Sequence, residues 1–184
     1  MGGTFDPIHY GHLVTAETVR SEFGLDYVLF VPSGRPPHKD PNLVCDSEHR
    51  YLMTVFATLN NPWFDVSRVD IDRVGQTYTI DTLRILKEEY GPCTQLYWIS
   101  GADVIADIMN WKNSEALVSQ AEFIAATRPG YQFPDYARQW FAGHGKTLYE
   151  LDVPAMAISS TDIRSRIENG KSIRYLVPES VDSY

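Results

Sequence analysis

The chain has 184 residues, of which 43% are hydrophobic and 22% charged, a composition and length that suit one globular domain over residues 1–184. Its net charge of −8 excludes a general nucleic-acid binder or an anionic-membrane binder, but not a local cluster of cations around a small anionic substrate. Two cysteines form no disulfide framework, which predicts a reducing cytoplasm. Apolar runs such as 27–31 are too short to span a membrane.

The first half of the chain is expected to alternate between helix and strand. Apolar residues at helical spacing predict a helix over 10–23, ended by Gly24, and the run 26–32 is typical of a buried strand. After a loop rich in proline, a second helix is expected to begin near Ser47. Its apolar face would consist of Leu52, Val55, Phe56 and Leu59.

The second half repeats this alternation. Further strands are expected over 63–67, 69–72, 94–100, 122–127 and 147–153. Helices are expected over 79–90, within 101–108, and from the residue after Thr161 to Gly170. The pattern predicts an α/β fold of the Rossmann-like, doubly wound type, with a mostly parallel sheet and a small C-terminal helical portion. In such sheets the loops that follow strands meet at one edge, where ligands bind.

The stretch GGTFDPIHYGH at 2–12 fits a loop between a strand and a helix. Only Met1 precedes it, so we expect the first strand to be truncated or disordered. Asp6-Pro7 is typical of a turn. His9 and His12 would lie at the start of the helix, where unpaired N–H groups and the helix dipole favour phosphate.

Other interpretations of these histidines remain open. A single histidine near a helix start is often structural, and a zinc site of His9, His12, Cys45 and His49 is conceivable, although the spacing matches no structural zinc motif. The loop matches neither the P-loop nor the dinucleotide-binding glycine pattern.

A second candidate phosphate site is the segment ISSTDIR at 158–164. Ser159, Ser160 and Thr161 would precede a helix and offer hydroxyls and free N–H groups, and Arg164 would follow one turn later. The planar guanidinium of arginine suits a polyphosphate because it can bind two oxygens at once. The simpler interpretation is a well-capped helix that carries an exposed arginine.

With these two motifs the chain resembles the nucleotidylyltransferase superfamily and, within it, the bacterial nicotinate mononucleotide adenylyltransferase family. Further matches follow in family order over nearly the whole chain. They are PSGRPPHK at 32–39, HRYLMT at 49–54, TYTIDTL at 77–83, SGAD at 100–103, MNW at 109–111 and TRPGY at 127–131. The resemblance implies adenylyl transfer from ATP to nicotinate mononucleotide, which yields nicotinate adenine dinucleotide and pyrophosphate, with Mg²⁺ carried by the ATP phosphates.

The resemblance also implies roles for individual residues. The catalytic residues would be His9, His12 and Arg164. The ATP-binding residues would be Gly3, Thr4, His9, His12, Gly101, Asp103, Ser160, Thr161 and Arg164. Of these, Asp103 would accept hydrogen bonds from ribose hydroxyls, and Arg128 could border the adenine or lie on the surface.

The mononucleotide would be bound by four residues. Lys39 would reach its phosphate, Trp111 would stack on the pyridine ring, and the backbone around Tyr78 and Thr79 would receive the carboxylate. Structural interpretations exist for each: Trp111 could belong to the core, Thr79 could cap its helix, and Lys39 could be solvated.

Three other functions are alternatives for this sequence. Phosphopantetheine adenylyltransferases usually have a threonine where this chain has His9, and glycerol phosphate cytidylyltransferases close with a different C-terminal motif. A nucleotide sensor without catalytic activity could keep the same fold. Such a protein is expected to lose a motif histidine or the arginine, and this chain keeps all three.

Overall fold

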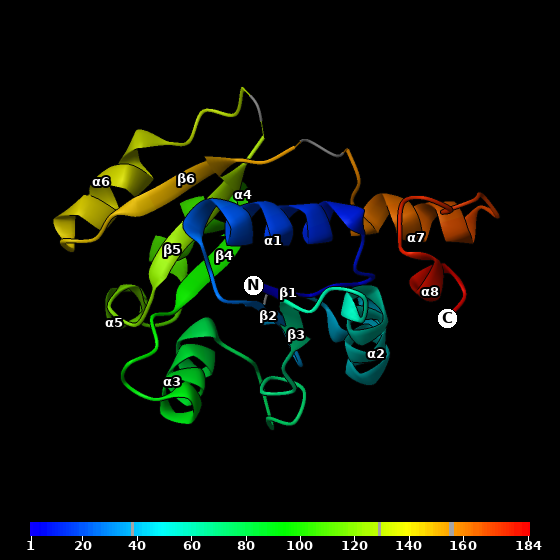
Figure 1. Ribbon diagram of the computed structural model, residues 1–184, viewed down its shortest axis with the longest axis horizontal. Coiled ribbons are helices and arrows are strands. Elements are labelled where there is room, and N and C mark those ends of the chain that lie inside the picture. Colours follow the sequence, from blue (N-terminus) through cyan, green and yellow to red (C-terminus); the bar gives the residue numbers. More distant parts are fainter. Residues whose placement is uncertain (38, 129, 155–156) are drawn as a thin grey trace.

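The computed structural model describes residues 1–37, 39–128, 130–154 and 157–184 (Figure 1). The strands are β1 (Gly2–Gly3), β2 (Val28–Pro32), β3 (Phe64–Val66), β4 (Tyr97–Gly101), β5 (Glu122–Thr127) and β6 (Leu148–Asp152). The longer helices are α1 (Tyr10–Phe23), α2 (Ser47–Thr58), α3 (Thr79–Tyr90), α6 (Asp135–Gly143) and α7 (Ser160–Glu168). Shorter helices are η1 (Pro41–Leu43), α4 (Ala102–Ala106), η2 (Ile108–Asn110), α5 (Ser114–Val118) and α8 (Glu179–Asp182). Within these ranges, no helix has the length and apolar character that a membrane crossing requires.

The strands form two parallel, three-stranded sheets that meet side by side. One has the order β1-β2-β3 and the other β4-β5-β6, and β1 contacts β4. Across both sheets the order is therefore β3-β2-β1-β4-β5-β6, which reverses direction between β1 and β4. This is the order of a doubly wound α/β fold, and its ligands bind where the order reverses. The predicted fold class is confirmed.

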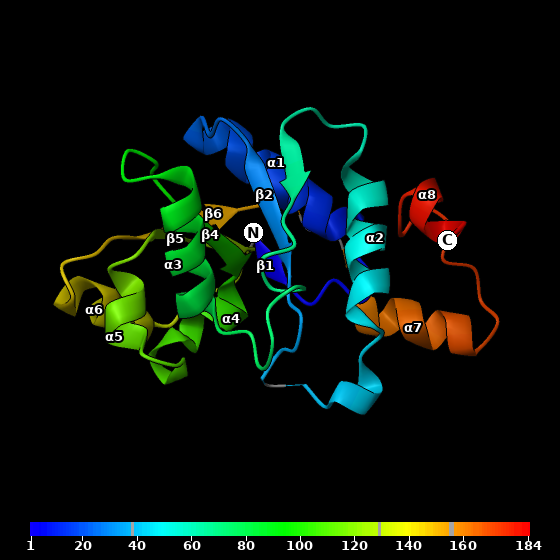
Figure 2. The same ribbon diagram turned by 90° about the horizontal axis from the view of Figure 1, so that it is seen from below.

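Helices cover both faces of the strands, and each face has its own apolar cluster. Ile99 and Ile124 join the cluster beneath α1, whereas Trp98 and Phe123, their neighbours in the chain, join the cluster under α3, α5 and α6. Because side chains alternate between the faces of a strand, fully buried strands contribute to both. Figures 1 and 2 show α1 and α3 on opposite sides of the strands.

Several expected elements need correction. The segment 69–72 is a turn instead of a strand, with the Asp72 N–H donating to the Arg68 carbonyl over 2.9 Å. The first strand is ordered but short: β1 spans two residues, the Met1 carbonyl accepts from the Val31 N–H over 2.9 Å, and a truncated first strand stays a prediction. Helices α5, α6 and α8 were not anticipated.

The buried face of α2 also differs from the expectation. Leu52 and Leu59 are 36% and 68% exposed, while Arg50, Thr54 and Thr58 are buried. The helix thus turns three polar residues inward, and Met53 and Ala57 add partly buried side chains to the apolar cluster beneath α1. The polar residues must find hydrogen-bond partners, since an unpaired buried polar group is costly.

Candidate active site

Two cavities adjoin at the carboxyl ends of β1 and β4, where the strand order reverses. The first, here the α3 cavity, has a volume of about 400 Å³, and Tyr78, Thr79 and Trp111 are among its lining residues. The second, the α1 cavity, has a volume of about 380 Å³ and extends past His9 and His12. The two linings share Gly2, Gly3, Ser100, Asp103 and Val104. Ligands in the two cavities would therefore meet above β1 and β4.

The two motif histidines lie together at the entrance of α1. The His9 N–H donates to Nδ1 of His12 over 3.3 Å, so a neutral His12 carries its proton on Nε2. Burial lowers the pKa of His9 to about 4. Burial and the nearby His9 lower the pKa of His12 to about 3. At neutral pH the protein without ligands therefore holds two uncharged imidazoles, each with one N–H to donate.

The ring of Phe5 packs against the ring of His12. The two rings meet edge to face, with centroids 5.1 Å apart, and Phe5 is 2% exposed. Phe5 has a φ of 51°, a left-handed conformation that is unusual for a bulky residue. A side chain on Gly3 would place its Cβ 2.7 Å from the Phe5 ring, so glycine is required there. The local backbone is thus shaped to seat an aromatic ring under His12.

The expectation of free N–H groups at the start of α1 is only partly met. The Tyr10 N–H donates to the Leu176 carbonyl over 3.1 Å, and the His12 N–H donates to the His9 carbonyl over 2.9 Å. The positive end of the helix dipole remains. Within the described residues, Nδ1 of His9 is buried and has no hydrogen-bond partner, so it is a polar atom that a ligand in the α1 cavity could satisfy.

The second phosphate motif meets the first through α7. Ser159 caps this helix, since its Oγ accepts from the Asp162 N–H over 3.1 Å. The Ser160 hydroxyl donates to the Pro7 carbonyl over 2.9 Å and lines the α1 cavity. Arg164 donates from Nη1 to the Asp6 carbonyl over 2.7 Å. Arg164 and the exposed Thr161 lie outside the lining of both cavities, so their contacts with a ligand stay predictions.

The remaining residues expected at the nucleotide lie at the ends of β4 and β5. Gly101 lines the α1 cavity, and Asp103 lines both cavities with an exposed side chain. Arg128 follows β5, is exposed, and also lines the α1 cavity. Thr4, expected at ATP, lines the α3 cavity instead.

The α3 cavity contains three of the four residues expected at the mononucleotide. Trp111 lines it while packing partly against the apolar cluster under α3, so its two interpretations are compatible. Lys112 lies over the Tyr78 ring, with Nζ 4.1 Å from the ring centre and 3.6 Å from Oδ2 of Asp81. Lys39 is exposed and lies outside the lining.

Two hydroxyl groups of the α3 cavity were missed by the sequence analysis. Oγ of Ser33 and Oγ1 of Thr77 are buried and have no hydrogen-bond partner among the described residues. Buried hydroxyls are rarely left unpaired, so both are candidates to bind a polar ligand. Their signal in the sequence is their place inside the two quoted motifs, PSGRPPHK and TYTIDTL.

The alternative zinc site finds no support. Nδ1 of His49 lies 2.6 Å from the hydroxyl of Tyr184, and Cys45 is exposed. In the part of the chain that the structure describes, no three His, Cys, Asp or Glu side chains gather as metal ligands would.

Comparisons with known proteins agree with this geometry. The family model described as cytidylyltransferase-like matches residues 1–166. A curated relative from Thermoanaerobacter sp., described as "Probable nicotinate-nucleotide adenylyltransferase", is 54% identical over 100% of this chain and 89% of its own length. A relative of the same description from Moorella thermoacetica is 55% identical over 100% of this chain and 86% of its own length.

A solved structure has the same fold at lower identity. The Plasmodium falciparum nicotinic acid mononucleotide adenylyltransferase complexed with NaAD matches with a TM-score of 0.79 at 23% identity, covering 98% of this chain and 90% of that one. The matches to the family model and to the curated relatives span most or all of the chain. The chain therefore belongs to the cytidylyltransferase-like family and, within it, to the nicotinate-nucleotide adenylyltransferases.

Proposed function

We propose that this protein transfers the adenylyl group of ATP to nicotinate mononucleotide, in a single domain over residues 1–184 that works in the cytoplasm. One observation carries the proposal most directly. The α1 cavity with its two histidines and the α3 cavity with Trp111 share a wall at Gly2, Gly3 and Asp103. Two ligands bound there would have their phosphates at the common wall.

ATP would occupy the α1 cavity. His9 and His12 would donate from their imidazoles to its phosphates, Ser160 would donate from its backbone N–H at the start of α7, and Thr161 and Arg164 would reach the phosphates from the same helix. Asp103 would accept hydrogen bonds from the ribose hydroxyls. Neutral imidazoles suit this position because each can donate an N–H without the cost of a buried charge.

Nicotinate mononucleotide would occupy the α3 cavity. Trp111 would stack on the pyridine ring, and the backbone of Tyr78 and Thr79 would receive its carboxylate. Lys39 would bind its phosphate from the neighbouring loop. The hydroxyls of Ser33 and Thr77, which have no hydrogen-bond partner among the described residues, would bind its ribose or phosphate.

The chemistry requires little from the protein beyond placement. An anionic oxygen of the mononucleotide phosphate attacks the α-phosphorus of ATP, and the bond from that phosphorus to the pyrophosphate oxygen breaks. The attacking oxygen is already ionised, so no general base is needed. Holding two reactants in line is worth roughly 7–11 kcal/mol in favourable cases. His9 and His12 would stabilise the charge that develops on the departing pyrophosphate.

Nucleotidyltransferases commonly use a divalent metal ion, and we propose Mg²⁺ for this one. The donor set suits a metal carried by the substrate: within the described residues no cluster of three acidic or imidazole ligands exists, and Mg²⁺ is often held by phosphate oxygens with few protein ligands. When bound, the ion would neutralise part of the phosphate charge.

The test is pyrophosphate release with ATP and Mg²⁺, with nicotinate mononucleotide, nicotinamide mononucleotide and phosphopantetheine offered in parallel. Turnover with nicotinate mononucleotide alone is the expected result. Turnover with phosphopantetheine alone would favour the other adenylyltransferase. If folded protein that binds ATP releases no pyrophosphate with any of the three, the protein would be a nucleotide sensor without catalytic activity.

A further inference from the structure

Arg50 of α2 is buried in the middle of the molecule, with 1% of its surface exposed. Its guanidinium donates to three backbone carbonyls: from Nε to Cys45 over 2.9 Å, from Nη1 to Thr4 over 2.7 Å, and from Nη2 to Gly34 over 3.0 Å. No acidic side chain of the described residues lies within ion-pair distance of it. Burying a cation without an ion-pair partner costs free energy. The position of Arg50 therefore suggests a role in holding these loop carbonyls in place.

The three carbonyls belong to two segments that contribute residues to the cavities. Thr4 lies in the turn between β1 and α1, two residues before Asp6. Gly34 and Cys45 stand near the two ends of the loop 33–46, which carries Lys39 and contributes Pro36 and Pro37 to the α3 cavity. One side chain therefore ties both ends of this loop to the turn that leads to His9 and His12.

Asp6 links the region around Arg50 to α7. Oδ2 of Asp6 accepts from the Cys45 N–H over 3.5 Å and lies 3.7 Å from Nη1 of Arg164. Burial lowers the pKa of Arg50, and the nearby carboxylate of Asp6 opposes that effect. The turn 4–6 is thus held between two arginines, Arg50 on the side of the loop 33–46 and Arg164 on the side of α7.

We propose that Arg50 is a positioning residue that holds the mononucleotide half of the site in register with the ATP half. This inference rests on the proposed function. Arg50 touches neither substrate; it sets the distance between the segments that do. The planar fork of an arginine can reach three carbonyls in fixed directions, whereas a lysine offers a single ammonium on a flexible stem. Arg50→Lys keeps the positive charge but no longer fixes the loop 33–46 relative to the turn 4–6.

The test compares ligands that occupy one half-site with the ligand that spans both. For Arg50→Lys, calorimetry should give affinities for ATP alone and for nicotinate mononucleotide alone within about threefold of the wild type. Nicotinate adenine dinucleotide should bind at least about tenfold more weakly, and kcat per active site should fall by about 100-fold, the usual effect of a misplacement near 1 Å.

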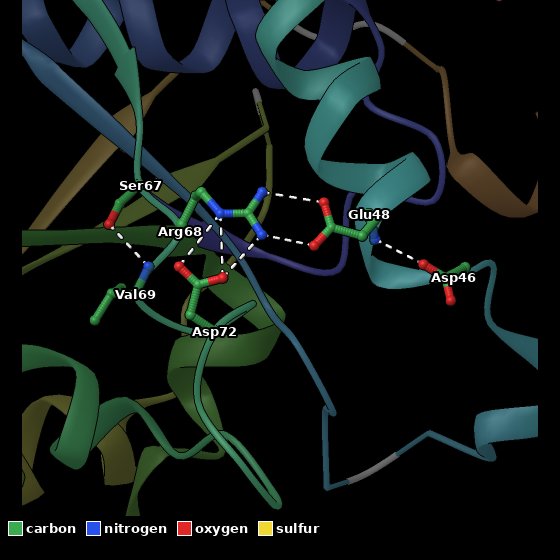
Figure 3. Close-up of polar contacts among 6 residues, drawn as sticks. All are labelled: Asp46, Glu48, Ser67, Arg68, Val69 and Asp72. Carbon is green, nitrogen blue, oxygen red and sulfur yellow. Dashed lines mark hydrogen bonds and ion pairs between the residues drawn. The ribbon is translucent and has the colours of Figure 1, made fainter.

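Arg68 supplies the matched control, because it also binds α2 to a neighbouring loop. Its Nη2 lies 2.6 Å from Oε1 of Glu48 and 2.8 Å from Oδ1 of Asp72 (Figure 3). None of these three residues lines either cavity. Arg68→Lys should leave all three affinities and kcat unchanged. The stoichiometry of ATP binding gives the active fraction of every variant, so unfolded molecules do not lower kcat artificially.

Three results would overturn the inference. The dinucleotide affinity and kcat of folded Arg50→Lys could match the wild type, or all three ligands could weaken equally. If neither Arg50→Lys nor Arg50→Gln folds, Arg50 serves stability alone. Failure of the proposed function would be distinct, because the wild-type protein would then bind neither the mononucleotide nor the dinucleotide.

Discussion

The imidazole rings of His9 and His12 are stacked, with their centroids 3.7 Å apart and 24° between their planes. Burial lowers the pKa of both imidazoles and His9 lowers that of His12 further, so the protein without ligands keeps both neutral at physiological pH. The pair then presents N–H donors to the α1 cavity. An anionic ligand bound there would raise the pKa of both imidazoles and so favour their charged form. This relationship links stability, pH and catalysis in the same two side chains.

Replacing His12 by alanine should remove a donor that acts on the departing pyrophosphate. Loss of one such donor costs about 3–4 kcal/mol of transition-state stabilisation, so kcat should fall by about 100-fold to 1,000-fold. Steady-state kinetics with both substrates saturating measures it. His144→Ala is the control, because His144 is exposed and lies outside both cavities. Equal kcat values for the two variants would contradict the role of His12.

Stability should fall as the pH is lowered from about 7 to about 4. The unfolded chain binds protons at these histidines near their ordinary pKa of 6.5, whereas the folded protein has pKa values of about 4 and 3. Protonation therefore favours the unfolded state over that window, with a slope of at most about 1.4 kcal/mol per pH unit for each imidazole. Urea unfolding at several pH values should give a flatter dependence for the double variant His9→Gln/His12→Gln. An identical slope would show that the pair does not titrate in this way.

Truncation of Trp111 should weaken mononucleotide binding more than ATP binding. Stacking of a base on an aromatic side chain is worth about 1–3 kcal/mol, so Trp111→Ala should raise KM for nicotinate mononucleotide by about tenfold or more. KM for ATP should change little, and Trp111→Phe should recover part of the loss. Trp63→Ala, at a half-exposed position outside both cavities, is the control. A parallel rise in both KM values would assign Trp111 to the core alone.

Gly34→Ala should destabilise the protein, because the new Cβ would stand 2.1 Å from the Asp70 carbonyl oxygen and 3.4 Å from Cγ2 of Thr77. Overpacking of this kind costs about 1–3 kcal/mol and here would push apart two walls of the α3 cavity. Thermal unfolding measures the cost. Gly143→Ala near the end of α6 meets nothing within 4 Å and should be neutral or stabilising. Comparable melting temperatures for both variants would refute the close approach at Gly34.

Elements with local start and stop signals were predictable from the sequence. Helix α1 ends at Gly24, which has a φ of 60°, and α3 ends at Gly91, which has a φ of 83°. Both lie in the left-handed region that glycine adopts at little cost, so the helix ends are encoded by single residues. The alternation of apolar segments likewise indicated the parallel sheet.

The buried face of α2 was not predictable in this way. The hydroxyls of Thr54 and Thr58 donate to the carbonyls of Arg50 and Thr54, over 2.7 Å and 2.9 Å, so they are satisfied within their own helix. Arg50 is satisfied by loops distant in the sequence. A pattern of apolar residues predicts that such polar positions face the solvent. It cannot include their hydrogen-bond partners, because some of these lie far away in the sequence.

The candidate site shows the same division. The resemblance assigned His9, His12 and Ser160 to ATP and Thr79 and Trp111 to the mononucleotide, and these two groups line two different cavities. Which side of α7 faces the cavity depends on packing between distant segments. That packing brings Arg164 to the Asp6 carbonyl, and no pattern in the sequence indicated the contact.

The most direct measurement follows the phosphorus atoms of ATP through a single turnover. The protein is mixed with Mg²⁺, nicotinate mononucleotide and ATP labelled at either the α- or the γ-phosphorus, and the products are separated. The account predicts that the α-label appears only in the dinucleotide and the γ-label only in pyrophosphate. Transfer of the γ-label to the mononucleotide, or release of the γ-label as inorganic phosphate, would contradict it.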